Sequence, residues 1–321
     1  MNKQQRKKVT EDQVAAFFSS YYTNWRLHQI LTNEKLLKEK FSFYSSIIEN
    51  SKQLDDETGD STIAQEITNG LLFESISYCI QYIEDLFALI KAGENKELFI
   101  KNIITYDAGK INNFIKQKLN IEQLCKCFHF PYFTEELQNK ETDKTYRESI
   151  DRLHKWIVEF KEFHSQHNFF YTQYKHGLTV ALRPLKKYTD EQIQKSKEGN
   201  FEPYLAAFDN LALEKLKDKK DRLNGLVFMP NLTEDIQHNI VELMSEDNLI
   251  RYVFPPKETD MELIKSVAYK VRDCIHIIAN NIIEETKNEN DAKVVQMQMP
   301  ASEIGKVVSF TFTYDGNKPS H

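Results

Sequence analysis

The chain has 321 residues, enough to bury one large or two medium hydrophobic cores. Its formal net charge of −6 and isoelectric point near 5.9 argue against a general nucleic-acid coat and a polybasic membrane binder. No apolar run reaches the roughly 20 residues that a membrane-spanning helix needs, and the first residues lack the apolar segment of a secretory signal. Because four scattered cysteines do not form a secreted disulfide framework, we expect a cytoplasmic protein with reduced thiols and no membrane association.

Helical spacing of apolar residues dominates the first two thirds of the chain. The small numbers of glycine and proline, 9 and 8, also favour long helices over sheets. A polar stretch over 53–61 predicts a loop, and an irregular piece is expected over 125–133. The stripes that predict helices lie at Val14–Trp25, Leu37–Ile48, Ile76–Ile90, 96–119 and Leu153–Tyr174.

After Gly177 the pattern becomes mixed. This glycine can take the left-handed conformation that closes a helix, here the long histidine-rich one. Two segments alternating with period two, 294–299 and 307–314, predict a terminal hairpin whose edge strand could pair with a second copy. The other expected elements are short β-like runs at 178–182, 226–229 and 250–254, a charged helix-prone stretch at 188–221, and helices at 233–246 and 260–285.

Together these elements predict a mainly α protein, in which an N-terminal helical bundle is followed by a small α+β C-terminal region that ends in a β-hairpin. We place the helical bundle at residues 1–187, a helical connector at 188–222 and the α+β region at 223–321.

The polar face at the end of the long helix is the first candidate site. Steps of three and four residues place His164, Asn168, Tyr171 and Lys175 on one face, beside a stripe that contains His167 and Tyr174. Histidine titrates near neutrality, and lysine and tyrosine can orient a phosphate or activate a hydroxyl. The alternative is that cationic residues in a last turn only complement the helix dipole, and that Gly177 is only a cap.

The segment Tyr171-Thr172-Gln173-Tyr174-Lys175-His176-Gly177 resembles the motif of the HEPN superfamily of helical bundles. That motif has an arginine, usually an asparagine next, then three or four residues and a histidine often followed by glycine. His176 and Gly177 match it, whereas Tyr171 and Thr172 occupy the arginine and asparagine positions. The resemblance covers about residues 60–185.

The resemblance implies a helical bundle and, in active members, metal-independent cleavage of RNA in toxin and phage-defence systems. Other members bind nucleotides or act as scaffolds, and the enzymes typically build their site from two copies. It therefore implies His176, Lys175 and Tyr171 as catalytic residues, with His164, Asn168 and Tyr174 as substrate-binding residues. Tyr171 cannot supply the charge or the bidentate phosphate contact of an arginine, so the resemblance implies the fold more than the activity.

Two other arginine–histidine pairs deserve comparison with this motif. Arg147 and His154 satisfy its loose spacing, although glutamate follows the arginine. Arg272 and His276 lie four residues apart, one short of the family minimum, and share a helix face with Tyr269. The alternative for the second pair is a surface arginine and a partly buried histidine.

Metal and cofactor signatures are weak. Cys125, Cys127 and His129 offer two thiolates and an imidazole at alternate positions, but zinc would need a fourth ligand from elsewhere. Asp-x-x-His steps occur at Asp151 and at two later positions, where the aspartate can simply orient an imidazole. No glycine-rich phosphate loop, nucleophile elbow or His-Glu-x-x-His motif is present. We therefore expect neither a metal nor a cofactor.

Two functions remain open from the sequence. In the first, the chain is a HEPN-like member of a bacterial conflict, phage-defence or RNA-processing system, either a metal-independent ribonuclease centred on His176 or a nucleotide-binding protein. RNA or a nucleotide would be its ligand, and a second copy or another protein its partner. In the second, it is a non-catalytic helical scaffold whose aromatic stripe is only core.

Overall fold

The computed structural model describes residues 3–52, 60–95, 98–133, 135, 137, 139–175, 180–181, 226–228, 250–252, 260–287, 293–315 and 318–320. The helix expected over 233–246 and the domain boundaries near 187 and 222 lie outside these residues, so they stay predictions. Of the loop expected over 53–61, only Asp60 and Ser61 are described, and they belong to a helix.

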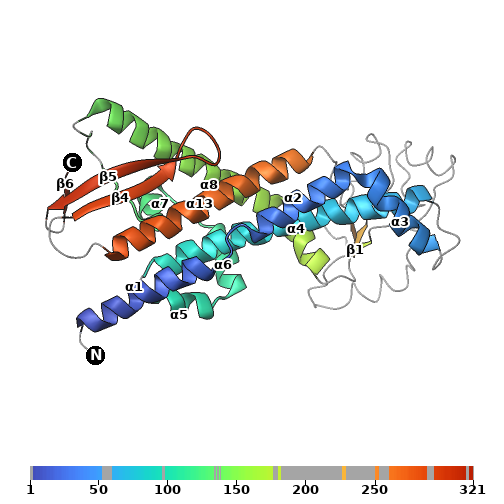
Figure 1. The fold of residues 1–321 in the computed structure, drawn as a ribbon, viewed down its shortest axis with the longest axis horizontal. Coiled ribbons are helices and arrows are strands. Elements are labelled where there is room, and N and C mark those ends of the chain that lie inside the picture. The colour runs from blue at the N-terminus through green and yellow to red at the C-terminus, as the bar shows by residue number, and fades with distance from the viewer. Residues whose placement is uncertain are drawn as a thin grey trace. The chain divides into compact units, whose positions relative to one another are not determined.

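The described chain is mainly helical and ends in a β-hairpin, which confirms the predicted fold class (Figure 1). Long helices form where the stripes of apolar residues are longest, as expected when one face of each helix is buried. The helices are α1 Lys3–Ser20, α2 Trp25–Lys38, α3 Lys40–Lys52, α4 Asp60–Gly93, α5 Phe99–Ile104, α6 Ala108–Ile115, α7 Ile121–Cys127, α8 Lys140–Lys175 and α13 Asp260–Lys287.

Two small sheets accompany the helices. Strands β1 Val180–Ala181, β2 Leu226–Phe228 and β3 Ile250–Tyr252 pair in parallel in that order. Strands β4 Lys293–Pro300, β5 Val307–Asp315 and β6 Lys318–Ser320 form an antiparallel sheet. The predicted terminal hairpin is thus confirmed. Met297 pairs with Phe310, and both side chains are buried, as the period-two alternation requires.

The chain divides into two compact units. The first comprises Met1–Thr32, Ser77–Gln166 and Glu262–His321, and the second comprises Asn33–Ile76 and His167–Met261. Helices α2, α4, α8 and α13 contribute residues to both units. The helical stripe predicted over Ile76–Ile90 is confirmed, because it lies within α4 and its apolar residues are buried.

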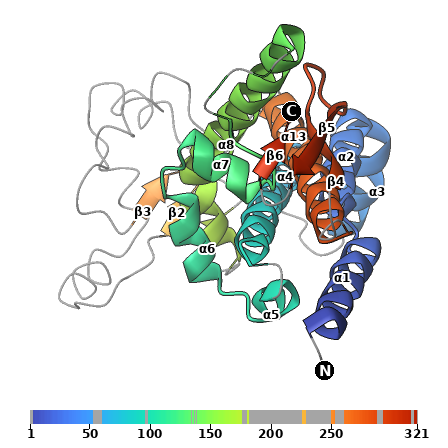
Figure 2. The ribbon, with the colours of Figure 1, turned by 90° about the vertical axis from the view of Figure 1, so that its left-hand side faces the viewer.

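In the first unit, helix α13 lies beside the terminal sheet and is hydrogen-bonded to β4 (Figures 1 and 2). Its fully buried Asn281 donates to the carbonyl oxygens of Phe128 and Gln298 and accepts from the Gln298 N–H at 2.8 Å. Arg152 of α8 donates to the Pro300 carbonyl oxygen at 2.9 Å. These bonds satisfy backbone groups at the outer edge of β4 that would otherwise lack partners.

The second unit is held by polar contacts between helices as well as by apolar packing. The buried Asn33 side chain of α2 donates to the Leu71 carbonyl oxygen and to the Ser75 hydroxyl of α4. Tyr44 of α3 forms a hydrogen bond of 3.2 Å with the Thr68 hydroxyl. Each bond pairs groups that burial would otherwise penalise.

Several boundaries differ from those expected. The stripe from Leu37 to Ile48 spans two helices, because α2 ends at Lys38 and α3 begins at Lys40. The stripe from Val14 to Trp25 spans two helices, because α1 ends at Ser20 and α2 begins at Trp25. The single helix expected over 96–119 is wrong, since α5 and α6 are separated where Asp107 caps α6 by accepting from the Lys110 N–H. The irregular piece expected over 125–133 begins later, after α7, which Asn120 opens with a capping box.

Among the described helices, none combines the length and the apolar character needed to cross a membrane.

Candidate functional site

The predicted substrate-binding residue His164 is buried inside the first unit. Its side chain is 3% exposed, and its Nε2 lies 3.6 Å from Oε1 of Glu84 on helix α4. This separation is too long for a hydrogen bond but short enough for electrostatic attraction when the ring is protonated. His164 therefore faces a carboxylate from the neighbouring helix instead of solvent.

Of the remaining residues of the predicted site, Asn168, Tyr171, Tyr174 and Lys175 belong to the end of α8, in the second unit. Tyr171 is buried at 8% exposure, whereas Asn168 is half-buried and accepts a backbone hydrogen bond from the Thr172 hydroxyl. The side chains of Tyr174 and Lys175, and all of His176, lie outside the described residues. Their catalytic and binding assignments stay predictions.

The second arginine–histidine pair of the sequence lies on α13 and has polar contacts with neighbouring residues. Arg272 and His276 lie one helical turn apart, and the described His276 ring is exposed at the surface of the first unit. The His276 Nε2 lies 3.4 Å from Oγ1 of Thr23 in the link between α1 and α2. Two segments distant in the sequence thus meet at this histidine.

His276 is predominantly neutral at neutral pH. Although His276 is exposed, the surrounding protein partly desolvates its imidazole and lowers its pKa, the neighbouring Arg272 guanidinium lowers it further, and Asp273 acts in the opposite direction. A neutral ring retains one nitrogen lone pair that can accept a proton.

Arg272 is fixed in place by two neighbours, Asp273 and Tyr269. Its Nε and Nη2 donate to Oδ1 of Asp273 at 2.9 and 2.6 Å, and its guanidinium lies 5.1 Å from the centre of the Tyr269 ring. The other Asp273 oxygen, Oδ2, accepts from the Gly305 N–H at 2.6 Å. The Arg272 Nη1 makes no hydrogen bond to any described residue, so this end of a 22% exposed side chain is left to donate to a ligand.

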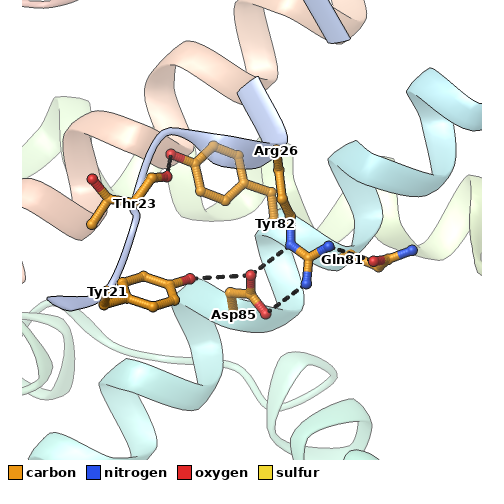
Figure 3. A network of polar contacts seen from close by, with 6 residues as sticks. All are labelled: Tyr21, Thr23, Arg26, Gln81, Tyr82 and Asp85. Atoms are coloured by element: carbon orange, nitrogen blue, oxygen red, sulfur yellow. Dashed lines mark hydrogen bonds and ion pairs between the residues drawn. The ribbon is translucent and has the colours of Figure 1, made fainter. Parts of the chain in front are cut away.

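A second arginine anchors the α1–α2 link on α4 (Figure 3). Arg26 donates from Nε to Oδ2 of Asp85 at 2.6 Å and from Nη2 to Oδ1 at 3.3 Å, and its Nη1 donates to Gln81. The Tyr21 hydroxyl also donates to Oδ2 of Asp85, at 3.1 Å. Burial, followed by the Asp85 charge, raises the pKa of Tyr21, which therefore remains a hydrogen-bond donor.

Thr23 connects this network to His276. The Tyr82 hydroxyl of α4 donates to the Thr23 carbonyl oxygen, as Figure 3 shows, while the Thr23 hydroxyl faces His276. Burial raises the pKa of Tyr82, so its phenol keeps the proton that it donates. The backbone of Thr23 is consequently held on both sides, by Tyr82 and by the anchored Arg26.

We define Thr23, Arg272 and His276 as the α13 site. A neutral imidazole that accepts a proton, next to a guanidinium that binds an oxyanion, can act on a phosphodiester without a metal. The alternative is that the contacts of Arg272 only stabilise the fold, because Arg272 orients Asp273 toward the hairpin turn.

Metal binding has little support in the described part of the chain. Among the described residues, no three His, Cys, Asp or Glu side chains come together as metal ligands would. Burial raises the pKa of the Cys125 thiol to about 12 and that of Cys127 to about 11, so both carry their protons at neutral pH. Thiolate ligation would have to overcome that cost.

Sequence reasoning found Arg272 and His276 but not their surroundings. Thr23 and His276 are 253 positions apart, and no spacing in the sequence links them. For Arg26 and Asp85 the sequence offered one sign of a polar contact inside the helical bundle: each charged residue lies in line with a mostly apolar helix face.

No model of a known protein family matches the chain, and neither a curated protein nor a solved structure matches it significantly.

Proposed function

We propose that the chain is a HEPN-like protein of a bacterial conflict, phage-defence or RNA-processing system, and that it cleaves RNA without a metal ion. The observation that supports it best is the α13 site, where a neutral histidine, a guanidinium with one unused nitrogen and a threonine hydroxyl meet. A cytoplasmic location and a homodimer or protein partner belong to the same proposal.

The chemistry follows from these groups. The neutral His276 ring takes the proton of an RNA 2′-hydroxyl, and the 2′-oxygen forms a bond to the adjacent phosphorus. The bond from phosphorus to the 5′-oxygen breaks, and water protonates that leaving oxygen. The hydroxide that remains takes the proton from the His276 imidazolium, which restores the neutral ring. Arg272 donates from Nη1 to a non-bridging oxygen as negative charge accumulates there. The products are a 2′,3′-cyclic phosphate and a 5′-hydroxyl end.

A second function, that of a non-catalytic scaffold, is favoured by a different observation. Charged side chains of the first unit pair with one another across helices: Arg26 with Asp85, and Lys270 with Glu159 at 2.8 Å. Such partly buried pairs fix helix positions and need no ligand. A protein that binds nucleotides without cleaving RNA would use the α13 site in the same way, because the phosphate of its ligand would bind at Arg272.

The deciding experiment is cleavage of total RNA and tRNA by the purified chain, in EDTA and with Mg²⁺. Three variants accompany it: His276→Ala, His176→Ala, and the control His154→Ala, which removes a half-buried histidine of α8. We expect EDTA-resistant cleavage that falls at least about 100-fold in His276→Ala and is unchanged in His154→Ala.

Each other result assigns the function differently. Loss of cleavage in His176→Ala alone would move the catalytic centre to His176, as the sequence motif implies. Cleavage that is absent from the purified chain, or equal in all four proteins, would refute the nuclease and leave the scaffold.

A further inference from the structure

Two exposed aromatic rings flank the threonine of the α13 site. Tyr22 is 58% exposed and Trp25 is 41% exposed, and both belong to the turn that the Trp25 N–H closes by donating to the Tyr22 carbonyl oxygen at 3.2 Å. Thr23, which contacts His276, lies between them in this turn. Neighbouring exposed aromatic rings beside a candidate site form the kind of apolar surface that marks ligand-binding sites.

The turn holds both rings in fixed positions. The Tyr22 hydroxyl bonds to Nδ1 of His28, and the two rings meet edge to face at 5.5 Å. The Trp25 ring meets Tyr78 edge to face at 5.9 Å. An edge contact orients a ring and occupies at most one of its faces, and the Arg26 guanidinium lies over one face of Trp25, so one face of a ring is what remains for a base to stack on.

Positive charge lies next to the same rings. The Arg26 guanidinium is 5.9 Å from the centre of the Trp25 ring, and three bonds to Asp85 and Gln81 prevent it from turning away. Aromatic rings interleaved with cations are the combination with which proteins bind single-stranded nucleic acids, since every base has a face that can stack.

We propose that Tyr22 and Trp25 stack the unpaired bases of a single-stranded RNA whose phosphate lies at Arg272 and His276. The inference rests on the proposed function and names its substrate class. In a duplex the base faces are already stacked on each other, so the platform selects unpaired segments over paired ones. The identity of the bases should change the affinity little, because stacking does not involve the hydrogen-bonding edges by which bases differ.

The two tryptophans of the chain make the test direct. Trp156 is buried at 6% exposure, so a fluorescence change on adding a ligand reports on Trp25. The probe is a single-stranded 2′-O-methyl RNA oligonucleotide, which lacks the 2′-hydroxyl that cleavage requires. We expect it to quench Trp25, and the same strand annealed to its complement to bind at least about tenfold more weakly.

Substitutions assign the binding to the two rings. Tyr22→Leu keeps the tryptophan reporter and is expected to weaken binding about tenfold. Trp25→Leu should weaken it similarly, and Trp25→Phe less, as measured by fluorescence anisotropy of a labelled oligonucleotide. The matched control is Tyr132→Leu, which removes a tyrosine that is 43% exposed elsewhere in the first unit and should leave the affinity unchanged.

The outcomes separate this inference from the proposed function. Quenching by the single strand that falls in Tyr22→Leu supports the platform, whether or not unmodified RNA is cleaved. Cleavage that needs His276 but is indifferent to Tyr22 and Trp25 overturns the platform and leaves the nuclease standing. Equal affinity for the duplex overturns it as well. So does fluorescence that changes with protein concentration and not with RNA, because that result identifies a surface for a second copy.

Discussion

The carboxylate of Asp273 accepts a hydrogen bond of 2.6 Å from the backbone N–H of Gly305, a residue with φ of +89° at the turn between β4 and β5. One helix side chain thereby fixes the turn of the hairpin. The same carboxylate also holds Arg272, so the α13 site and the terminal sheet share a single anchor.

Removing this anchor should destabilise the protein strongly. Asp273 is 5% exposed at its side chain, and Asp273→Ala leaves the Arg272 charge and the Gly305 N–H without their partner. We expect a loss of about 3 kcal/mol in the free energy of unfolding, measured in urea. In the control Glu303→Ala, an exposed ion pair with Lys306 in the same turn is lost at a cost below about 0.5 kcal/mol. Equal effects of the two changes would contradict the anchor.

We expect Asn281, which binds the backbone of β4, to contribute as much to the free energy of unfolding as Asp273 does. Asn281→Ala removes the partners of the Gln298 N–H and of the carbonyl oxygens of Gln298 and Phe128. Leaving these buried groups unpaired should cost about 3 kcal/mol in the free energy of unfolding. Among the described residues, the side chain of the neighbouring Asn280 bonds only to the Gln298 side chain, so Asn280→Ala should cost less than about 1 kcal/mol. Thermal unfolding of the two variants measures the difference.

The Arg26–Asp85 pair predicts a third difference in stability. The two side chains are 17% and 28% exposed, so Arg26→Ala leaves a partly desolvated carboxylate behind. We expect a loss of about 2 kcal/mol in urea unfolding, part of which Asp85→Asn in the same chain restores. Lys144→Ala, which breaks a pair whose members are 77% and 56% exposed, should have no measurable effect. A double variant no more stable than Arg26→Ala would show that the pair is not coupled.

Stability should fall in mild acid because of His276. Its pKa in the folded protein is lowered, so the unfolded chain binds more protons below the usual histidine pKa. This contribution is complete above about pH 6.5 and is lost as the pH falls toward the lowered pKa. Urea titrations at pH 7.5 and pH 5.5 should show a smaller decrease for His276→Gln than for the unmodified chain. An identical decrease would mean that His276 is fully solvated.

The four cysteine thiols should be unreactive in the folded protein. All four are free and buried, and burial raises the pKa of each, for Cys127 to about 11. Because the thiolate is the nucleophile, we expect no labelling by a thiol-disulfide reagent at pH 7.5 within the time that labels all four in urea. Rapid labelling of Cys127 in the native protein would contradict its burial.

The sequence predicted the parts of the fold in which one periodic signal decides the structure. The stripes of α4, α8 and α13 are long enough that burial of a single face determines the helix, and the alternation at 294–299 similarly determines β4. The breaks were missed where a local cap overrides a continuing stripe. Asp107 is the clearest case, because its carboxylate satisfies the Lys110 N–H while the apolar spacing runs on.

The candidate site was harder to predict, for a different reason. Periodicity shows which residues share a helix face but not which helix lies opposite. His164 has the spacing of a surface residue in the polar face of α8, yet the neighbouring α4 covers it and places Glu84 beside it. Likewise, the partner of His276 comes from a link whose sequence carries no sign of its destination.

The Asn281 carboxamide imitates the peptide group of an adjacent strand. It engages both the N–H and the carbonyl oxygen of Gln298, the two groups that an incoming strand would need on that side of β4. A row of such unoccupied groups is the template on which sheets of different molecules join and aggregate. By occupying this position from its own helix, the chain closes the sheet to additional strands at Gln298 and protects itself from edge-to-edge polymerisation there.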